Sequence, residues 1–228
     1  SDMCVAAIAW NAHPRWLLVA AANRDEFHAR PTGALARWDN GILAGRDLLA
    51  GGTWMGIAEA GRFALVTNYR VPEGPQPGRP SRGEFVTALL TGQETAPPEA
   101  LNPFNLFLAE GEQAWFIGNH PDRRRELLAA GVHGLSNGAF ERPWPKTRQL
   151  ADDLAAWLAQ PGDETEPRFA ALPREDPSDV TDHGPEPRLA PVFIRDETYG
   201  TRCSSVVAID RQGHGFVRER RFDPLGQV

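Results

Sequence analysis

Cys4 is the first residue of the chain with an obvious capacity for covalent chemistry, and it directly follows Met3. We expect Met3 to be the natural start and residues 1–3 to combine an expression scar with the initiator methionine, so that the trimmed protein begins at Cys4. An N-terminal cysteine carries a thiol and a free α-amine on one carbon. That amine has a pKa near 7.7–8.0 and can take the thiol proton at neutral pH, which activates the sulfur. The alternative is that Cys4 is a small buried residue at a strand start.

A second group of polar side chains directly follows the apolar run at residues 16–22; its members are Asn23, Arg24, Asp25 and Glu26. Polar groups at the end of a buried strand need hydrogen-bonding partners. One interpretation is a strand-end turn held by Asx hydrogen bonds and an Arg–carboxylate pair. The other is that these residues belong to a functional site.

The elements that must position these residues are mostly strands. The runs 4–10 and 16–22 lack polar alternation, as expected for strands covered on both faces. Three later pairs of apolar segments have the form of hairpins. They are 53–59 with 62–69, 105–111 with 113–119, and 202–210 with 214–222.

Two segments predict helices. In residues 81–92, Ser81 stands three residues before Glu84, which is the spacing of a capping box, and Gly92 ends the apolar stripe. In residues 144–160, Pro145 suits the first turn of a helix and an apolar stripe follows it. Buried strands covered by amphipathic helices predict an α+β layered architecture.

Proline marks the irregular parts of the chain. We expect residues 72–80 and 161–190 to be surface loops or short helices around a single core, so that residues 1–228 form one domain.

Seven short motifs occur in order along nearly the whole chain. They are NRDE at 23–26, GGTWMG at 51–56, TNYR at 67–70, SRGEF at 81–85, GLSN at 134–137, WPK at 144–146 and YGTRCSSVV at 199–207. Together they resemble the NRDE family, also called the transport and Golgi organisation protein 2 family. The resemblance implies a four-layer αββα sandwich of two mostly antiparallel sheets, like that of N-terminal-nucleophile hydrolases. It also ties the chain to haem trafficking and to lipid or acyl-CoA handling.

A more distant similarity, to the cholylglycine hydrolase and penicillin V acylase group, implies roles for individual residues. Cys4 resembles the nucleophile and Asp25 the residue that holds its amine. Asn68 and Asn137 resemble the oxyanion and amine-orienting positions, and Arg202 the supporting charge. The acylase group has Arg-Asn-x-Asp, whereas here Ala22 occupies the arginine position and Arg24 lies two residues later.

Further residues complete the predicted site. Asn23, Arg24 and Glu26 are expected to support it from nearby. Trp54 and Tyr69 are candidates for a binding pocket, although simple core packing is the alternative for Trp54. We read the Gly-rich segment at 51–56 as a tight turn entering a strand, because it lacks the Lys-Ser/Thr of a phosphate-binding loop. Cys203, within an apolar strand, is interpreted as a buried residue.

Two functions follow from this pattern. The first is a hydrolase in which Cys4 attacks the amide or thioester carbonyl of a small-molecule substrate, with no cofactor required. The second is a non-catalytic protein that carries haem, acyl-CoA or another amphipathic ligand on the same fold. Axial ligation of haem by a single His, Met, Cys or Tyr stays open.

Composition removes several other classes. The formal net charge is -6 and no basic face stands out, so nucleic acid is not an expected partner. The longest apolar run is too short to span a membrane, and the start of the chain lacks the basic region of a secretory signal, so we expect a cytoplasmic protein. The six scattered histidines do not suggest a metal site. The sequence does not specify an oligomeric state.

Overall fold

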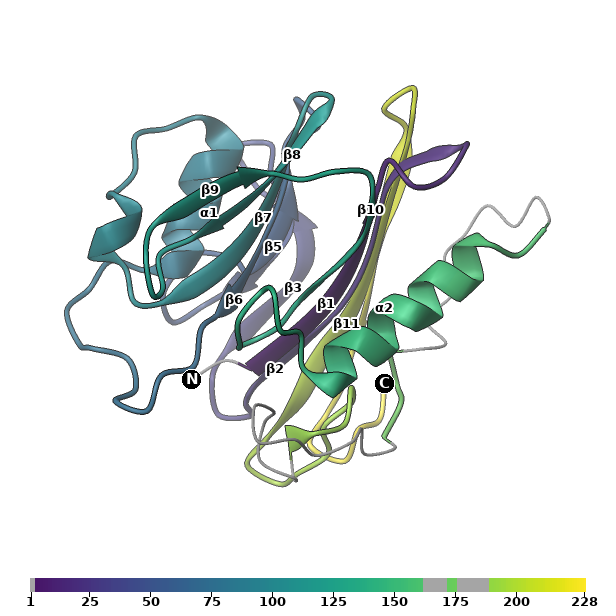
Figure 1. The fold of residues 1–228 in the computed structure, drawn as a ribbon. Coiled ribbons are helices and arrows are strands. Elements are labelled where there is room, and N and C mark those ends of the chain that lie inside the picture. Colours follow the sequence, from purple (N-terminus) through teal and green to yellow (C-terminus); the bar gives the residue numbers. More distant parts are fainter. Residues whose placement is uncertain (1–2, 162–171, 176–188) are drawn as a thin grey trace. The chain divides into compact units, whose positions relative to one another are not determined.

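The computed structural model describes residues 3–161, 172–175 and 189–228, and these form a mixed α+β protein with two antiparallel sheets (Figure 1). The strands are β1 (Met3–Trp10), β2 (Trp16–Phe27), β3 (Thr32–Arg37), β4 (Leu43–Asp47), β5 (Met55–Ile57), β6 (Phe63–Asn68), β7 (Phe104–Glu110), β8 (Gln113–Gly118), β9 (Arg124–Leu127), β10 (Gly131–Leu135), β11 (Tyr199–Asp210) and β12 (Gly215–Arg221). The helices are α1 (Arg82–Thr91), α2 (Pro145–Leu158) and the short 3-10 helix η1 (Pro98–Ala100).

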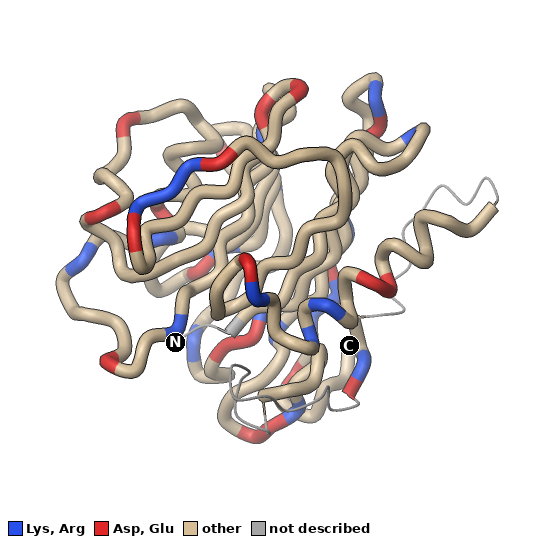
Figure 2. Tube along the Cα trace, in the orientation of Figure 1, with Lys and Arg blue, Asp and Glu red and all other residues tan. Residues whose placement is uncertain are grey.

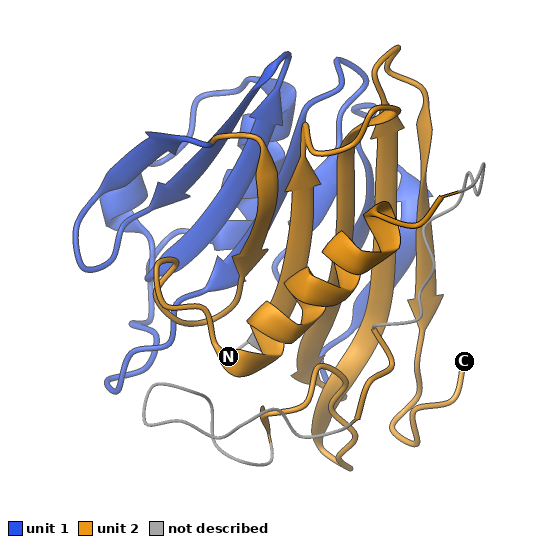
Figure 3. Ribbon diagram, turned by 45° about the vertical axis from the view of Figure 1, so that its right-hand side comes forward, with its two compact units in different colours: residues 1, 29–128 blue, residues 2–28, 129–228 orange. Residues whose placement is uncertain are grey.

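The chain groups into two compact units, each containing one sheet and one α-helix (Figure 3). Residues 29–128 hold the seven-stranded sheet, in the order β3-β4-β5-β6-β7-β8-β9, and α1. Residues 2–28 and 129–228 hold the five-stranded sheet, in the order β10-β1-β2-β11-β12, and α2. The α+β class with two antiparallel sheets is therefore confirmed. The four-layer order, the hydrolase-like label and the single domain stay predictions.

Helix α1 covers one face of the seven-stranded sheet. Its Phe85, Val86 and Leu90 pack with Ala64 and Val66 of β6 in one apolar cluster. The helix starts at the predicted N-cap, because the Ser81 hydroxyl accepts a hydrogen bond from the Glu84 amide at 3.2 Å; this is one of the two bonds of a capping box. Gly92 ends the helix in the left-handed conformation, at a φ of 67°.

The Gly-rich segment passes directly beneath the first turn of α1. Gly51 has a φ of 84°, and its amide donates to the Asp47 carbonyl at 2.7 Å, which closes the predicted tight turn. A Cβ added at Gly52 would lie 2.5 Å from the backbone nitrogen of Glu84 and closer still to the carbonyl carbon of Gly83. Only glycine fits at Gly52, because backbone occupies the space.

Helix α2 covers one face of the five-stranded sheet. Leu150 and Leu154 pack with Val5 of β1, Val19 of β2 and Val206 of β11. Trp157 and Leu158, which complete the predicted stripe, lie partly buried against the same cluster. The odd-numbered residues of β1 and β2 therefore face the helix, since side chains alternate along a strand.

The strand boundaries correct several expectations. Strand β2 does not end before the polar residues 23–26 but continues through them to Phe27, so the strand-end turn is wrong. The predicted strand at 53–59 forms regular structure only over β5. Strands β3, β4, β9 and β10 had no clear signal, because they are short or largely exposed.

Loops and surface charge agree with the sequence pattern where they are described. Residues 72–80 form turns and coil, whereas most of the block at 161–190 lies outside the described residues. Basic and acidic positions are interspersed along the trace (Figure 2).

Among the described residues, no helix is long and apolar enough to cross a membrane, and no group of three His, Cys, Asp or Glu side chains is arranged to hold a metal ion.

Candidate functional site

The candidate residues of the five-stranded sheet converge on the end of β2. In the antiparallel ladder, Arg24 pairs with Cys4 of β1 on one side and with Cys203 of β11 on the other. Directly paired residues project from the same face of a sheet, with Cβ atoms about 4.5–5.5 Å apart. Arg24 is thus the immediate neighbour of both cysteines. The arginine of the acylase pattern corresponds to Ala22, whereas this chain has arginine two residues later, at Arg24. Residues 22 and 24 project from the same face of β2, and residue 24 is the one that pairs with Cys4.

Asp25 projects from the opposite face of β2 and is fully buried. The Thr201 hydroxyl donates to Asp25 Oδ1 at 2.7 Å, and the Tyr199 hydroxyl donates to its backbone carbonyl at 3.2 Å. On the side of β2 that faces β1, the backbone of Asp25 pairs with that of Met3. Asp25 therefore occupies the ladder position next to the pair formed by Cys4 and Arg24.

Asn137 contacts that nitrogen directly. Strand β10 pairs antiparallel with β1 through Leu135 and Ala6, so the chain two residues beyond Leu135 arrives beside Cys4. The Cys4 amide donates to Asn137 Oδ1 at 3.0 Å, and both residues are buried. The structure thus brings Asn137 into contact with the Cys4 nitrogen, and the strand pairing places Asp25 at the neighbouring ladder position.

Lys146, in the first turn of α2, joins this group from the helix side. Its Nζ lies 3.9 Å from Asp25 Oδ2 and donates to the Leu189 carbonyl at 3.2 Å, with both charged side chains fully buried. The pKa of Lys146 is lowered, because burial outweighs the attraction to Asp25 and Cys4 that raises it. Removing an ion from water costs several kcal/mol, so the two opposite charges depend on each other.

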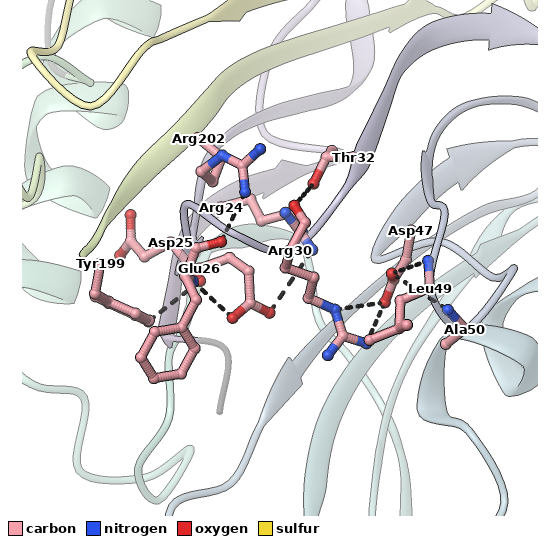
Figure 4. Close-up of polar contacts among 11 residues, drawn as sticks. Arg24, Asp25, Glu26, Arg30, Thr32, Asp47, Leu49, Ala50, Tyr199 and Arg202 are labelled. Carbon is pink, nitrogen blue, oxygen red and sulfur yellow. Dashed lines mark hydrogen bonds and ion pairs between the residues drawn. The ribbon is translucent and has the colours of Figure 1, made fainter. Parts of the chain in front are cut away.

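The other members of the NRDE segment have distinct contacts. Arg24 and Glu26 share one face of β2, and Arg24 Nη2 lies 3.8 Å from Glu26 Oε2 in a buried ion pair (Figure 4). Glu26 Oε1 also accepts the Phe27 amide at 2.7 Å. Asn23 donates to the Leu172 and Val192 carbonyls and accepts from Ser204, so it holds the connecting segments onto the sheet.

Arg202 occupies an irregular position of β11. The register shifts between Thr201 and Cys203, which leaves Arg202 in a bulge. Its Nη1 donates to the Phe27 carbonyl at 2.8 Å. Burial, followed by repulsion from Arg24 and Arg221, lowers the pKa of Arg202.

Cys203 is a buried thiol that cannot form a disulfide with Cys4. Burial and the nearby Glu219 raise the pKa of the Cys203 thiol to about 12, so this thiol stays protonated at neutral pH. Because Arg24 separates the two cysteines, their Cα atoms lie two strand spacings apart, roughly 9–10 Å, which exceeds the span of a disulfide.

The remaining candidates, Asn68, Trp54 and Tyr69, belong to the other compact unit. Asn68 ends β6 and pairs with Phe104. Trp54 is buried and its carbonyl accepts the Val66 amide, while the Tyr69 ring lies 4.6 Å from that of His120. Their part in the site stays a prediction.

Two residues at the centre of the network were missed as site residues. Thr201 fixes Asp25, and Lys146 balances its charge. A signal for Lys146 was present, because it is the only lysine among the 24 Lys and Arg residues of the chain. It also stands in the first turn of a helix, where the helix dipole disfavours a cation.

Comparisons with known proteins agree with the motif pattern. Residues 3–224 match the family model described as Transport and Golgi organisation 2. A homologue of Transport and Golgi organization protein 2 from Bos taurus is 32% identical, covering 96% of this chain and 92% of the relative. The Homo sapiens homologue is 31% identical over the same shares, and the Drosophila melanogaster protein is 24% identical over 99% of this chain and 95% of its own. The chain therefore belongs to the Transport and Golgi organisation 2 family.

Proposed function

We propose that this protein is an N-terminal cysteine hydrolase that cleaves an amide or thioester bond of a small molecule. The observation that carries the proposal is the environment of the Cys4 nitrogen, which donates to Asn137 and lies beside the strand position of Asp25. Removal of residues 1–3 would turn this nitrogen into an α-amine. The buried amide oxygen of Asn137 would then orient the amine and leave its lone pair for the thiol proton.

The reaction would proceed in two steps. The α-amine of Cys4 takes the proton of its own thiol, and the sulfur attacks the substrate carbonyl. The bond to the leaving thiol or amine breaks, the leaving group receives the proton, and the acyl group stays on Cys4 as a thioester. Water, deprotonated by the same amine, then releases the acid and restores the thiol.

The positive charge near Cys4 supports this chemistry. Arg24 is the cross-strand neighbour of Cys4 on the same face, and a nearby cation stabilises a thiolate, while the ion pair of Arg24 with Glu26 offsets part of this effect. In the group that this site resembles, an amide side chain stabilises the oxyanion, and Asn68 is the candidate for that role.

Turnover of a substrate panel tests the proposal. A version beginning at Cys4, made with a protease that leaves cysteine as the first residue, should hydrolyse at least one acyl thioester or N-acyl amide. The untrimmed chain should be at least about 100-fold slower, because its Cys4 nitrogen is an amide without a basic lone pair.

Two variants make the test specific. Cys4→Ala should abolish turnover, whereas Cys203→Ala should retain it. Absence of turnover in the trimmed protein across both substrate classes would refute the hydrolase assignment. If haem or acyl-CoA bound with equal affinity to the trimmed protein, the untrimmed chain and Cys4→Ala, the carrier function would replace it.

A further inference from the structure

We propose that Lys146 is a positioning residue that balances the charge of Asp25, so that Asp25 can hold the α-amine of Cys4 without trapping it as an ammonium ion. This inference rests on the proposed function. It concerns a residue that the resemblance to the acylases does not include.

The negative charge of Asp25 opposes the role of the Cys4 amine as a base in the proposed site. A buried carboxylate beside the Cys4 amine would stabilise the protonated amine, because opposite charges attract strongly away from water. An ammonium ion cannot accept the thiol proton. Asp25 alone would therefore orient the amine and at the same time weaken it as a base.

Lys146 resolves this conflict by its position. Its Nζ lies 3.9 Å from Asp25 Oδ2, so the pair has no net charge when both groups are ionised. Thr201 holds the other carboxylate oxygen at 2.7 Å, and the Leu189 carbonyl holds Nζ at 3.2 Å. Both charges are thus fixed by hydrogen bonds from separate parts of the chain.

The surroundings of Lys146 leave Asp25 as its main electrostatic partner. Asp25 on β2 and the Cys4 thiol on β1 are the titratable groups that act on it, and the Trp144 ring lies 6.0 Å from Nζ. On α2 itself, Arg148 points its charge toward solvent, since it is exposed. Removing Lys146 would therefore take away the positive charge that lies 3.9 Å from Asp25 Oδ2.

The choice of residue strengthens the inference. The chain uses arginine at every other basic position and places its only lysine here, fully buried in the first turn of a helix. Lysine presents a compact point charge, whereas arginine needs space and partners for a planar five-donor group. A compact charge can face one carboxylate oxygen and leave room for the amine.

The experiment measures the protonation of the amine directly. In protein that begins at Cys4 and carries ¹⁵N-cysteine, the α-amine nitrogen differs in chemical shift from the Cys203 backbone amide, so NMR follows its titration alone. We expect the wild-type midpoint near the ordinary value of about 7.7–8.0. In Lys146→Met the midpoint should rise by at least about one pH unit, because loss of a nearby positive charge in a buried site favours the protonated amine.

Matched variants separate this effect from loss of structure. Arg148→Met removes the same charge from the exposed side of the same helical turn and should move the midpoint by less than about 0.3 unit. A shift below about 0.3 unit in folded Lys146→Met would overturn the proposal. If Lys146→Met does not fold, the wild-type titration decides, because a midpoint above about 9 would mean that Asp25 is not balanced.

The titration needs no substrate, so its result does not depend on whether the protein is a hydrolase. If the pKa of the amine changes in Lys146→Met but the protein shows no turnover, the hydrolase proposal is wrong and the charge balance stands. If the protein shows turnover but the pKa of the amine does not change in Lys146→Met, the hydrolase proposal stands and the role of Lys146 is wrong.

Discussion

The buried pair formed by Lys146 and Asp25 should be strongly coupled in the stability of the intact chain. Both side chains are 0% exposed and their charged atoms lie 3.9 Å apart. Removing one partner of a buried ion pair typically lowers the free energy of unfolding by about 3–5 kcal/mol, because the other charge stays buried without compensation. Lys146→Met and Asp25→Asn should each show a loss of this order.

The double variant carries the decisive information. With both charges gone, no uncompensated ion remains, so Lys146→Met combined with Asp25→Asn should cost at least about 2 kcal/mol less than the sum of the single changes. Urea denaturation at pH 7, followed by tryptophan fluorescence, gives the four free energies of the cycle. The exposed pair Arg37 and Glu59, at 3.1 Å, serves as the control and should couple by about 0.5 kcal/mol or less.

Additivity within about 0.5 kcal/mol at the buried pair would refute the reasoning. It would mean that the two groups do not stabilise each other, and that Lys146 cannot balance the charge of Asp25.

Three further predictions follow from the same structure. Gly52→Ala should lower the free energy of unfolding by about 3 kcal/mol or more, because its Cβ would meet the backbone of α1; denaturation with an unchanged midpoint would contradict this close approach. Asn137→Ala should cost about 1–3 kcal/mol, since it leaves the buried Cys4 amide without this acceptor, and hydrogen exchange at Cys4 should accelerate. The raised pKa of the Cys203 thiol stabilises the folded state fully below the ordinary thiol pKa, and this stabilisation is lost as the pH rises to about 12. Above pH 9 the free energy of unfolding of the wild type should fall by up to about 1.4 kcal/mol per pH unit. In Cys203→Ala the free energy of unfolding should fall less steeply with pH.

Much of the fold was predictable because its signals are local. The apolar runs 4–10 and 16–22 became β1 and β2, and Ser81 caps the N-terminus of α1. The errors fell where burial and polarity disagree. Residues 23–26 are polar yet lie inside β2, where Arg24 and Glu26 pair with each other and Asp25 and Asn23 accept hydrogen bonds from β11.

The site was predictable only in part, since register is a property of the folded sheet. The sequence shows Arg24 displaced by two residues from the acylase pattern, but only the ladder shows that this places it opposite Cys4. Likewise, Asn137 is separated from Cys4 by 133 positions and reaches it through the pairing of β10 with β1. Lys146 lies beside Asp25 because α2 packs on the face of the five-stranded sheet from which Asp25 projects. The apolar stripe of α2 predicts that the helix covers a sheet, but not which residues of the sheet it contacts.

The location of an acyl adduct shows whether Cys4 is the nucleophile. Protein that begins at Cys4 is mixed with an acyl thioester, quenched in acid within seconds, and examined by intact mass and peptide fragmentation. We expect a mass increase equal to the acyl group less one hydrogen, located on Cys4, present in Cys203→Ala and absent from the untrimmed chain. An adduct on Cys203, or none on Cys4 with any thioester that the protein hydrolyses, would show that Cys4 is not the nucleophile.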